Sequence, residues 1–253
     1  MIDLRRVFAV YRRNWLVWRK LAPASLLGNV AEPLITLVAF GYGLGSLLTE
    51  VNGIAYIVFL AAGAMCMSTT MAASFEALYS AFARMQVQRT WDSILNAPVG
   101  LDEILLAEWL WAATKGVFAG SAIVLVCVAM DISRAPQLIF VLPLIVLTGL
   151  CFAAIGLVFN ALARGYDFFT FYFTLGLTPM VFVSGVYYPV DTLPAWLAAL
   201  SSVLPLGAAV SLVRPLVLGQ WPEQIVMPLA LIGFWTVLAL VIARALTLRR
   251  FAR

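Results

Sequence analysis

Few residues in this chain of 253 could carry out chemistry on their own. It has no histidine, which removes the most common general base and metal ligand. Its three cysteines, Cys66, Cys127 and Cys151, each lie in an apolar segment, and no two have the spacing of a metal site or a redox motif. No serine or aspartate pair has a spacing that indicates a catalytic site either. We therefore expect neither a metal site nor an enzymatic activity.

The sequence also lacks the residues that bind and hydrolyse a nucleotide. It contains no G-x-x-x-x-G-K-[ST] phosphate loop and only two lysines. The glycines of residues 41–45 have no G-x-G-x-x-G spacing, and close packing between helices explains them better. We expect no cofactor on this chain, so any ATP and magnesium must bind to another one.

The composition is that of an integral membrane protein. Hydrophobic residues make up 64% of the chain and charged residues 11%, and the mean hydropathy is +1.01. No polar stretch is long enough to fold as a separate soluble domain. We expect a single all-α, polytopic membrane domain covering residues 1–253.

Apolar runs predict six transmembrane helices, because a spanning helix needs about 20 mostly apolar residues. They cover residues 25–48, 54–75, 110–130, 137–162, 168–183 and 225–246. With both termini in the cytoplasm, thirteen of the sixteen basic residues fall on the inner side, as the positive-inside rule requires. The sequence thus predicts a multi-pass protein of the bacterial inner membrane.

Residues 1–22 have the pattern of an amphipathic helix. At 100° per residue one face gathers Leu4, Val7, Phe8, Tyr11, Trp15 and Trp18, and the opposite side gathers Arg5, Arg6, Arg12, Arg13, Arg19 and Lys20. Such a helix lies on the anionic inner surface of a membrane. A merely solvated charged face would leave the aromatic residues exposed. The proposed anchors to the membrane lipids are Arg5, Arg12, Arg13, Trp15 and Trp18.

The most polar internal segment covers residues 84–100. It predicts a short cytoplasmic helix that ends before Pro98. One face carries Val87, Trp91, Ile94 and Leu95, and another carries Gln88, Asp92 and Asn96. This pattern suits a helix that rests on the membrane and contacts a partner, but a plain connecting helix would show the same periodicity.

Residues 185–221 are apolar but interrupted by prolines. Because proline removes a helix hydrogen bond, we expect two short helices, near residues 194–203 and 206–218, with Pro205 at their joint. An apolar connection of this kind indicates a re-entrant hairpin, and the charge distribution places it on the outer face.

A few residues are candidates for gating or for lining a transport pathway. Glu32 is the carboxylate candidate deep in a span, and its place near the start of that span favours a structural or gating role over substrate binding. Aromatic rings suit sugar stacking or contact with lipid tails, although membrane packing would use them equally well. The other candidates are Tyr172, Phe182, Tyr187, Tyr188 and Pro205.

Several stretches carry a resemblance to a known family. The sequence SGVYYPVDTLPAWL at residues 184–197, with LPL and RPLVLG after it, resembles the end of type 2 ABC-transporter membrane subunits. More narrowly, four stretches resemble permeases of nodulation-factor exporters, and the similarity covers nearly the whole chain. They are KLAPASLLGN from Lys20, QRTW from Gln88, AATK from Ala112 and YDFF from Tyr166.

The resemblance implies a homodimer that works with two copies of a separate cytoplasmic ATPase and exports an amphiphilic cargo such as a lipo-oligosaccharide or a glycolipid. It makes residues 84–100 the coupling helix. The positions assigned to coupling are Arg84, Gln88, Arg89, Trp91, Asp92 and Leu95. A permease for a hydrophobic drug fits the broad family equally, and no nucleic-acid partner is expected.

A secondary transporter driven by an ion gradient is the alternative from another class. It would need inverted repeats and carboxylates near the membrane midplane. We find no convincing repeat, and Glu32 is the one deep carboxylate candidate.

Overall fold

The computed structural model describes residues 2–47, 50–51 and 53–252, without the side chains of residues 24, 26, 29, 30, 32, 33 and 44. The described chain is mostly helical. Its strands are a short antiparallel pair, β1 (Glu50–Val51) and β2 (Ile54–Ala55). The chain is therefore an all-α protein, as predicted.

Four of the described helices are long and apolar enough to cross a membrane. One covers Tyr56–Val87 and consists of α3 (Tyr56–Phe75) and a continuation with two π-helical segments, η3 (Glu76–Ser80) and η4 (Ala83–Val87). The second is α5 (Leu101–Ala129). The others are α6 (Val141–Leu162), preceded by η5 (Pro136–Phe140), and α11 (Val226–Phe251).

The segments expected as the first and fifth spans form shorter helices. The first is α2 (Ala22–Val38), followed by η1 (Ala39–Gly43) and η2 (Leu44–Ser46). The fifth is the series α7 (Asp167–Phe171), η6 (Tyr172–Leu177) and α8 (Thr178–Val183). At 1.5 Å per residue, the 17 residues of 167–183 span about 26 Å, slightly less than a hydrocarbon core. The described helices thus establish four spans by length and composition, or five if the bent pair α9 and α10 counts as one.

Two helices extend beyond the spans predicted within them. The helix that contains the second span continues from residue 75 to Val87, and the helix that contains the third span begins at Leu101 rather than at residue 110. The physical reason is that Glu76, Arg84 and Glu108 neutralise one another between the two helices. Charged residues that look like helix ends in the sequence therefore lie inside the bundle.

The segment 84–100 also differs from its prediction. Only α4 (Thr90–Leu95) is a separate helix, and Arg84 belongs to the long helix before it. Arg89 separates the two in a left-handed conformation with φ of 48°, which non-glycine residues adopt at a cost.

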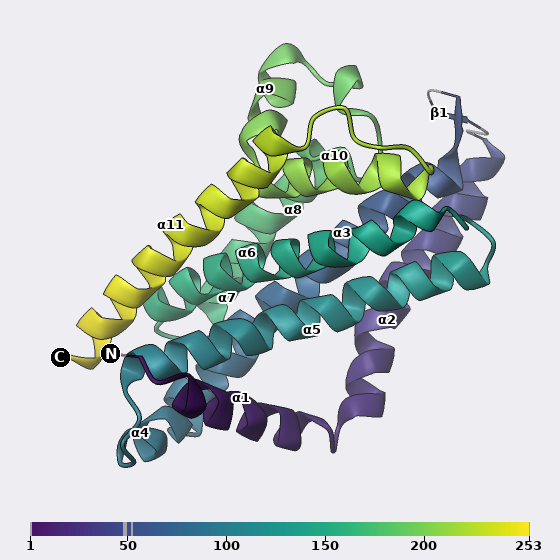
Figure 1. Ribbon diagram of the computed structural model, residues 1–253. Coiled ribbons are helices and arrows are strands. Elements are labelled where there is room, and N and C mark those ends of the chain that lie inside the picture. The colour runs from purple at the N-terminus through teal and green to yellow at the C-terminus, as the bar shows by residue number, and fades with distance from the viewer. Residues whose placement is uncertain (1, 48–49, 52, 253) are drawn as a thin grey trace.

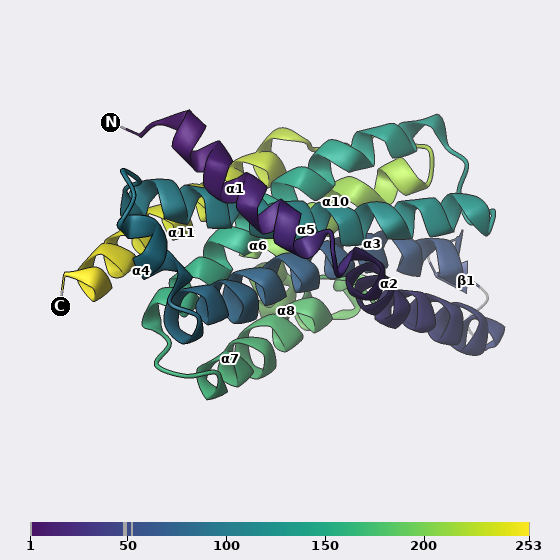
Figure 2. The same ribbon diagram turned by 90° about the horizontal axis from the view of Figure 1, so that it is seen from below.

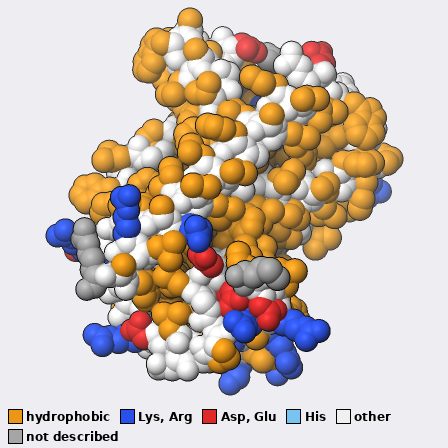
Figure 3. All heavy atoms as spheres, turned by 60° about the vertical axis from the view of Figure 1, so that its left-hand side comes forward, with side chains coloured by type: hydrophobic (Ala, Val, Ile, Leu, Met, Phe, Trp, Pro, Cys, Tyr) orange, Lys and Arg blue, Asp and Glu red, His pale blue; other side chains and the backbone are white. Residues whose placement is uncertain are grey.

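Helices α3, α5 and α6 lie side by side, α11 packs along α6, and α1 (Leu4–Trp18) crosses α5 (Figures 1 and 2). Small residues allow this close approach: a Cβ atom on Gly116 of α5 would lie 2.8 Å from the backbone oxygen of Thr69 in α3. Both termini and α4 lie at one end of the bundle, and β1 lies at the other (Figure 1). In Figure 3, hydrophobic side chains cover most of the visible face, and charged ones concentrate toward the lower end.

The proline-rich segment folds as η7 (Val190–Thr192), α9 (Ala195–Val203) and α10 (Pro205–Val217). The axes of α9 and α10 differ by 87°, and Pro205 is the first residue of α10. Helix α10 packs against α3, α6 and α11 and buries most of its side chains, whereas α9 buries only Ser201. Helix α10, the second helix of the hairpin, is thus part of the packed core.

Candidate functional site

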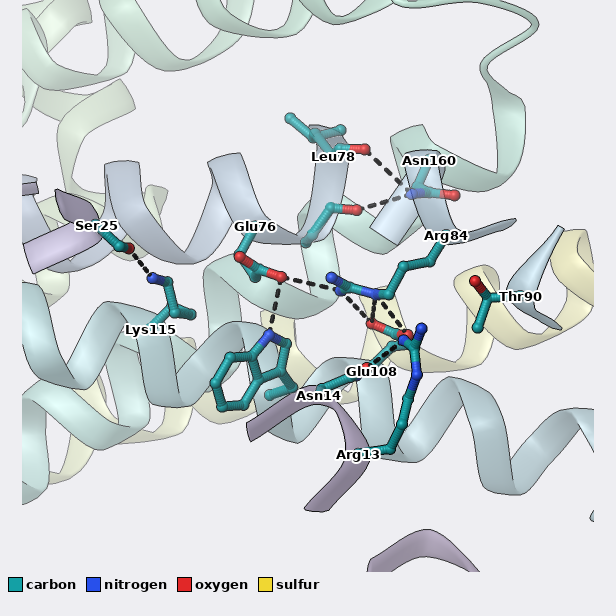
Figure 4. Close-up of polar contacts among 12 residues, drawn as sticks. Arg13, Asn14, Ser25, Glu76, Leu78, Arg84, Thr90, Glu108, Lys115 and Asn160 are labelled. Carbon is teal, nitrogen blue, oxygen red and sulfur yellow. Dashed lines mark hydrogen bonds and ion pairs between the residues drawn. The ribbon is translucent and has the colours of Figure 1, made fainter. Parts of the chain in front are cut away.

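A buried ion cluster joins the long helices α3–η4 and α5 near the end that carries α4 (Figure 4). Arg84 donates from Nε to both oxygens of Glu108, at 2.9 and 3.1 Å, and from Nη2 to Glu108 Oε2 at 2.5 Å. The same Nη2 lies 2.9 Å from Glu76 Oε1. One guanidinium is therefore shared by two carboxylates, of which Glu76 is 7% exposed and Glu108 is 1% exposed.

Two tryptophans complete the cluster. Trp111 Nε1 donates to Glu76 Oε1 at 2.9 Å, and Trp91 Nε1 donates to Glu108 Oε1 at 3.3 Å. Buried charges are tolerated only when they are paired and hydrogen-bonded, and both carboxylates meet this condition. Since Trp91 belongs to α4, the cluster fixes the short helix to α5.

The segment around α4 has a buried side and an exposed side. Trp91 is 1% exposed and its ring lies 6.0 Å from that of Phe251. Gln88, Arg89 and Asp92 are exposed. The structure therefore divides the residues assigned to coupling: these three are available to a partner, Leu95 is half-buried, and Arg84 and Trp91 connect the segment to the membrane helices.

The first turn of α5 holds the neighbouring helices in place. Glu103 accepts hydrogen bonds from the backbone N–H groups of Asp3, at 2.8 Å, and Gly100, at 2.7 Å. Asp102 accepts two hydrogen bonds from Arg244 of α11, at 2.8 and 2.9 Å. The start of α1 and the end of α11 are thus tied to the same helix.

Helix α1 is amphipathic, and part of its apolar face packs on α5. Tyr11 Oη and Thr114 Oγ1 are 3.0 Å apart, and the ring of Trp18 stacks on that of Phe118 at 5.1 Å. Trp15 remains 37% exposed. Trp18, expected to be a membrane anchor, therefore contacts protein.

The basic residues of α1 point in different directions. Arg5 and Arg12 are exposed, in keeping with a surface role. Arg13 turns toward the buried cluster (Figure 4). Partial burial and the neighbouring Arg84 guanidinium lower the pKa of Arg13 below its ordinary value, although an arginine remains charged under any physiological condition.

The gating and pathway candidates do not form one group. The side chain of Glu32 lies outside the described residues. Tyr172 is 5% exposed and bonds to Ser74 through its hydroxyl, at 2.8 Å. Its contacts are those of a residue that packs helices together.

The other aromatic candidates lie near α8. The ring of Phe182, a half-exposed residue, lies 5.6 Å from that of Tyr187. Tyr187 donates a hydrogen bond to Met67 Sδ at 3.3 Å, and Tyr188 is half-buried. Pro205 is buried at the start of α10. Phe182 and Tyr187 are therefore the two candidates that the structure brings together.

Sequence reasoning missed Glu76, Glu108 and Trp111 as parts of a site. Two signals were present: Glu76 and Arg84 are eight residues apart, which places them on one helix face, and Glu108 and Trp111 are three apart. The pairing between helices could not be found, because it depends on how α3 packs against α5.

Residues 5–218 match the model of the ABC-2 type transporter family. The chain belongs to this family. It is therefore a transport permease, the membrane subunit of a transporter, and a multi-pass membrane protein with an ABC ATPase subunit as its implied partner.

The chain is similar to Nodulation protein J from several bacteria. It is 43% identical to that of Sinorhizobium fredii over 242 residues, which cover 96% of this chain and 92% of the relative. It is 42% identical to that of Rhizobium leguminosarum bv. viciae over 245 residues, 97% of this chain and 95% of the relative. A more distant relative is the inner membrane transport permease YadH of Escherichia coli, 26% identical over 187 residues, which are 72% of this chain and 73% of that protein.

Proposed function

We propose that this chain is the permease of an ATP-driven exporter that moves an amphiphilic lipo-oligosaccharide or glycolipid out of the cytoplasm. Two copies form the pathway, and two copies of a separate ABC ATPase drive it. The family supports the ATPase partner, and the similarity to Nodulation protein J over nearly the whole chain supports the cargo class.

The proposal depends most on the connection from α4 to the membrane helices. Trp91 bonds to Glu108, Glu108 pairs with Arg84, and Arg84 pairs with Glu76. A force on α4 thus acts directly on both α5 and the long helix 56–87. Such a connection is what a transporter needs if hydrolysis takes place on a different chain.

The ATPase docks on the exposed residues Gln88, Arg89 and Asp92, with Leu95 at the edge of the contact. When ATP closes the ATPase dimer, it pulls on residues 84–98 and on α1. This movement opens a path between the two copies along their first, second and fifth spans.

The finer topology completes the proposal. Six spans cross the inner membrane, with α2 as the first and the series α7 to α8 as the fifth. Both termini and α4 face the cytoplasm, which agrees with their position at one end of the bundle (Figure 1). The α9–α10 pair then lies toward the outer face, where cargo leaves. Phe182 and Tyr187, which contact each other, are placed to stack against a sugar ring.

The source of energy gives the decisive experiment. The chain is reconstituted in proteoliposomes with and without its ABC ATPase, and movement of a fluorescent lipo-oligosaccharide is followed. We expect transport only with the ATPase and ATP. Transport by the permease alone under an ion gradient would contradict the proposal and favour a secondary transporter. ATP-driven movement of a hydrophobic drug, but not of the lipo-oligosaccharide, would overturn the cargo class alone.

A further inference from the structure

A cavity of about 260 Å³ lies where α1, the η3–η4 end of the long helix and α5 meet. Its wall includes Arg13, Asn14 and Trp18 from α1 and Glu76 and Arg84 from the ion cluster. This volume is well above the roughly 10–15 Å³ that one water molecule needs. The transport cycle proposed above gives this cavity no role.

Two buried hydrogen-bond donors in the cavity wall have no acceptor within the described part of the chain. Asn14 is 3% exposed, and its Oδ1 accepts a hydrogen bond from Arg13 Nη1 at 3.0 Å. Its Nδ2 has no partner, and neither has Nε1 of Trp18. Since buried donors are almost always satisfied in native proteins, an acceptor in the cavity would complete the site.

One charge in the cavity wall is unpaired. Arg13, Arg84 and Glu76 line the cavity, and Arg84 also pairs with Glu108. Both carboxylates already bind Arg84 and a tryptophan N–H. Arg13 takes part in none of the ion pairs found among the described residues. A negatively charged ligand in the cavity would pair with Arg13.

We propose that this cavity binds a phosphate group, held by Arg13, Asn14 Nδ2 and Trp18 Nε1. A guanidinium together with unpaired N–H donors is a common arrangement for binding an oxyanion. The phosphate is either free in the cytoplasm or part of a lipid headgroup that reaches under α1. In both cases it links α1 to the helix end that leads into α4.

Phosphate binding to the purified, delipidated full chain tests the site, with tryptophan fluorescence as the readout because Trp18 and Trp111 line the cavity. The variants are Asn14→Leu and Arg13→Met. Arg12→Met is the control, since it removes the same charge from an exposed position of the same helix. Arg13→Lys keeps the charge and should retain part of the binding. We expect Asn14→Leu and Arg13→Met to bind phosphate at least about tenfold more weakly than the original chain. This is the loss typical of a hydrogen bond to a charged group.

A second experiment, with lipid, distinguishes the two sources of phosphate. The same proteins are reconstituted in nanodiscs of phosphatidylcholine and phosphatidic acid, purified from them and examined by native mass spectrometry. A phosphatidic acid adduct on the original chain and on Arg12→Met, but not on the other two variants, identifies the headgroup as the ligand. Binding of inorganic phosphate without such an adduct identifies the free ion. Absence of both, or equal binding by correctly folded variants, would show that the cavity holds only water and would overturn the proposal.

Discussion

Arg84 and Glu108 form a bidentate ion pair between the long helix 56–87 and α5, and its shortest contact is 2.5 Å. The same carboxylate accepts the N–H of Trp91, so one side chain holds together a helix of six residues and two membrane helices. The proposed transfer of energy from α4 to the membrane helices depends on this ion pair.

Removing one charge from this pair should destabilise the protein strongly. In Glu108→Gln, Arg84 keeps only Glu76, and breaking a buried ion pair typically costs about 3–5 kcal/mol. We expect a clearly lower apparent Tm in thermal unfolding of the detergent-purified chain.

Asp102→Asn is the matched control for this change. It breaks the pair with Arg244, whose side chain is 59% exposed, so the loss should be small. Equal shifts in Tm for the two variants would mean that the buried cluster contributes no more than a surface pair.

The close packing of α5 on α3 gives a second prediction. Gly116→Ala adds a Cβ atom 2.8 Å from the Thr69 backbone oxygen and 3.0 Å from Ala73 Cβ. Overpacking of this kind costs about 1–3 kcal/mol, which outweighs the better helix propensity of alanine. Yield of the folded protein and its apparent Tm should both fall.

Gly233→Ala in α11 makes the same substitution where nothing lies within 4 Å of the new Cβ. Here only the helix propensity acts, and we expect a gain of up to about 1 kcal/mol. A Gly116→Ala protein as stable as Gly233→Ala would show that the two helices are further apart than described.

The joint between α9 and α10 gives a third prediction. Pro205 starts α10 at an 87° bend, and a Cβ atom on Gly207 would lie 2.5 Å from the Ser201 backbone oxygen, so the two arms meet closely. Pro205→Ala removes the restriction that proline places on Leu204, the extended residue between the two helices, and so relaxes the bend. We expect export to fall while membrane insertion is unchanged.

Insertion is measured by protease protection and export by cargo outside the cell. Pro194→Ala, at an exposed position before α9, should leave both unchanged. If Pro205→Ala lowers insertion and export equally, the bend serves folding and has no separate role in transport.

The extent to which the sequence predicts this structure differs between its parts. The two helices of the proline-rich segment were predicted to within about one residue of α9 and α10, because prolines end and start helices locally. The amphipathic helix α1 was found from its periodicity. In both cases the signal lies within the segment itself.

The errors arise where the outcome depends on another helix. Glu76 and Arg84 look like the end of a span until Glu108 is known to face them. Trp91 was assigned to coupling, but the sequence could not show that its N–H reaches Glu108 or that its ring is buried. Periodicity gives the face of a helix, but not the neighbour that covers it.

The proposed coupling runs from the ATPase through Trp91 of α4 to the membrane helices, and Trp91→Phe tests it most directly. Phenylalanine keeps a ring beside Phe251 but loses the hydrogen bond to Glu108. Trp109→Phe is the matched control, because it removes a tryptophan hydrogen bond to Leu150 in α6, away from α4.

Cargo-stimulated ATP hydrolysis is measured in proteoliposomes that contain the permease and its ATPase. We predict that Trp91→Phe keeps the basal rate but loses most of the stimulation and of the transport, whereas Trp109→Phe retains both. Unchanged stimulation and transport in Trp91→Phe would contradict the role of α4 in coupling.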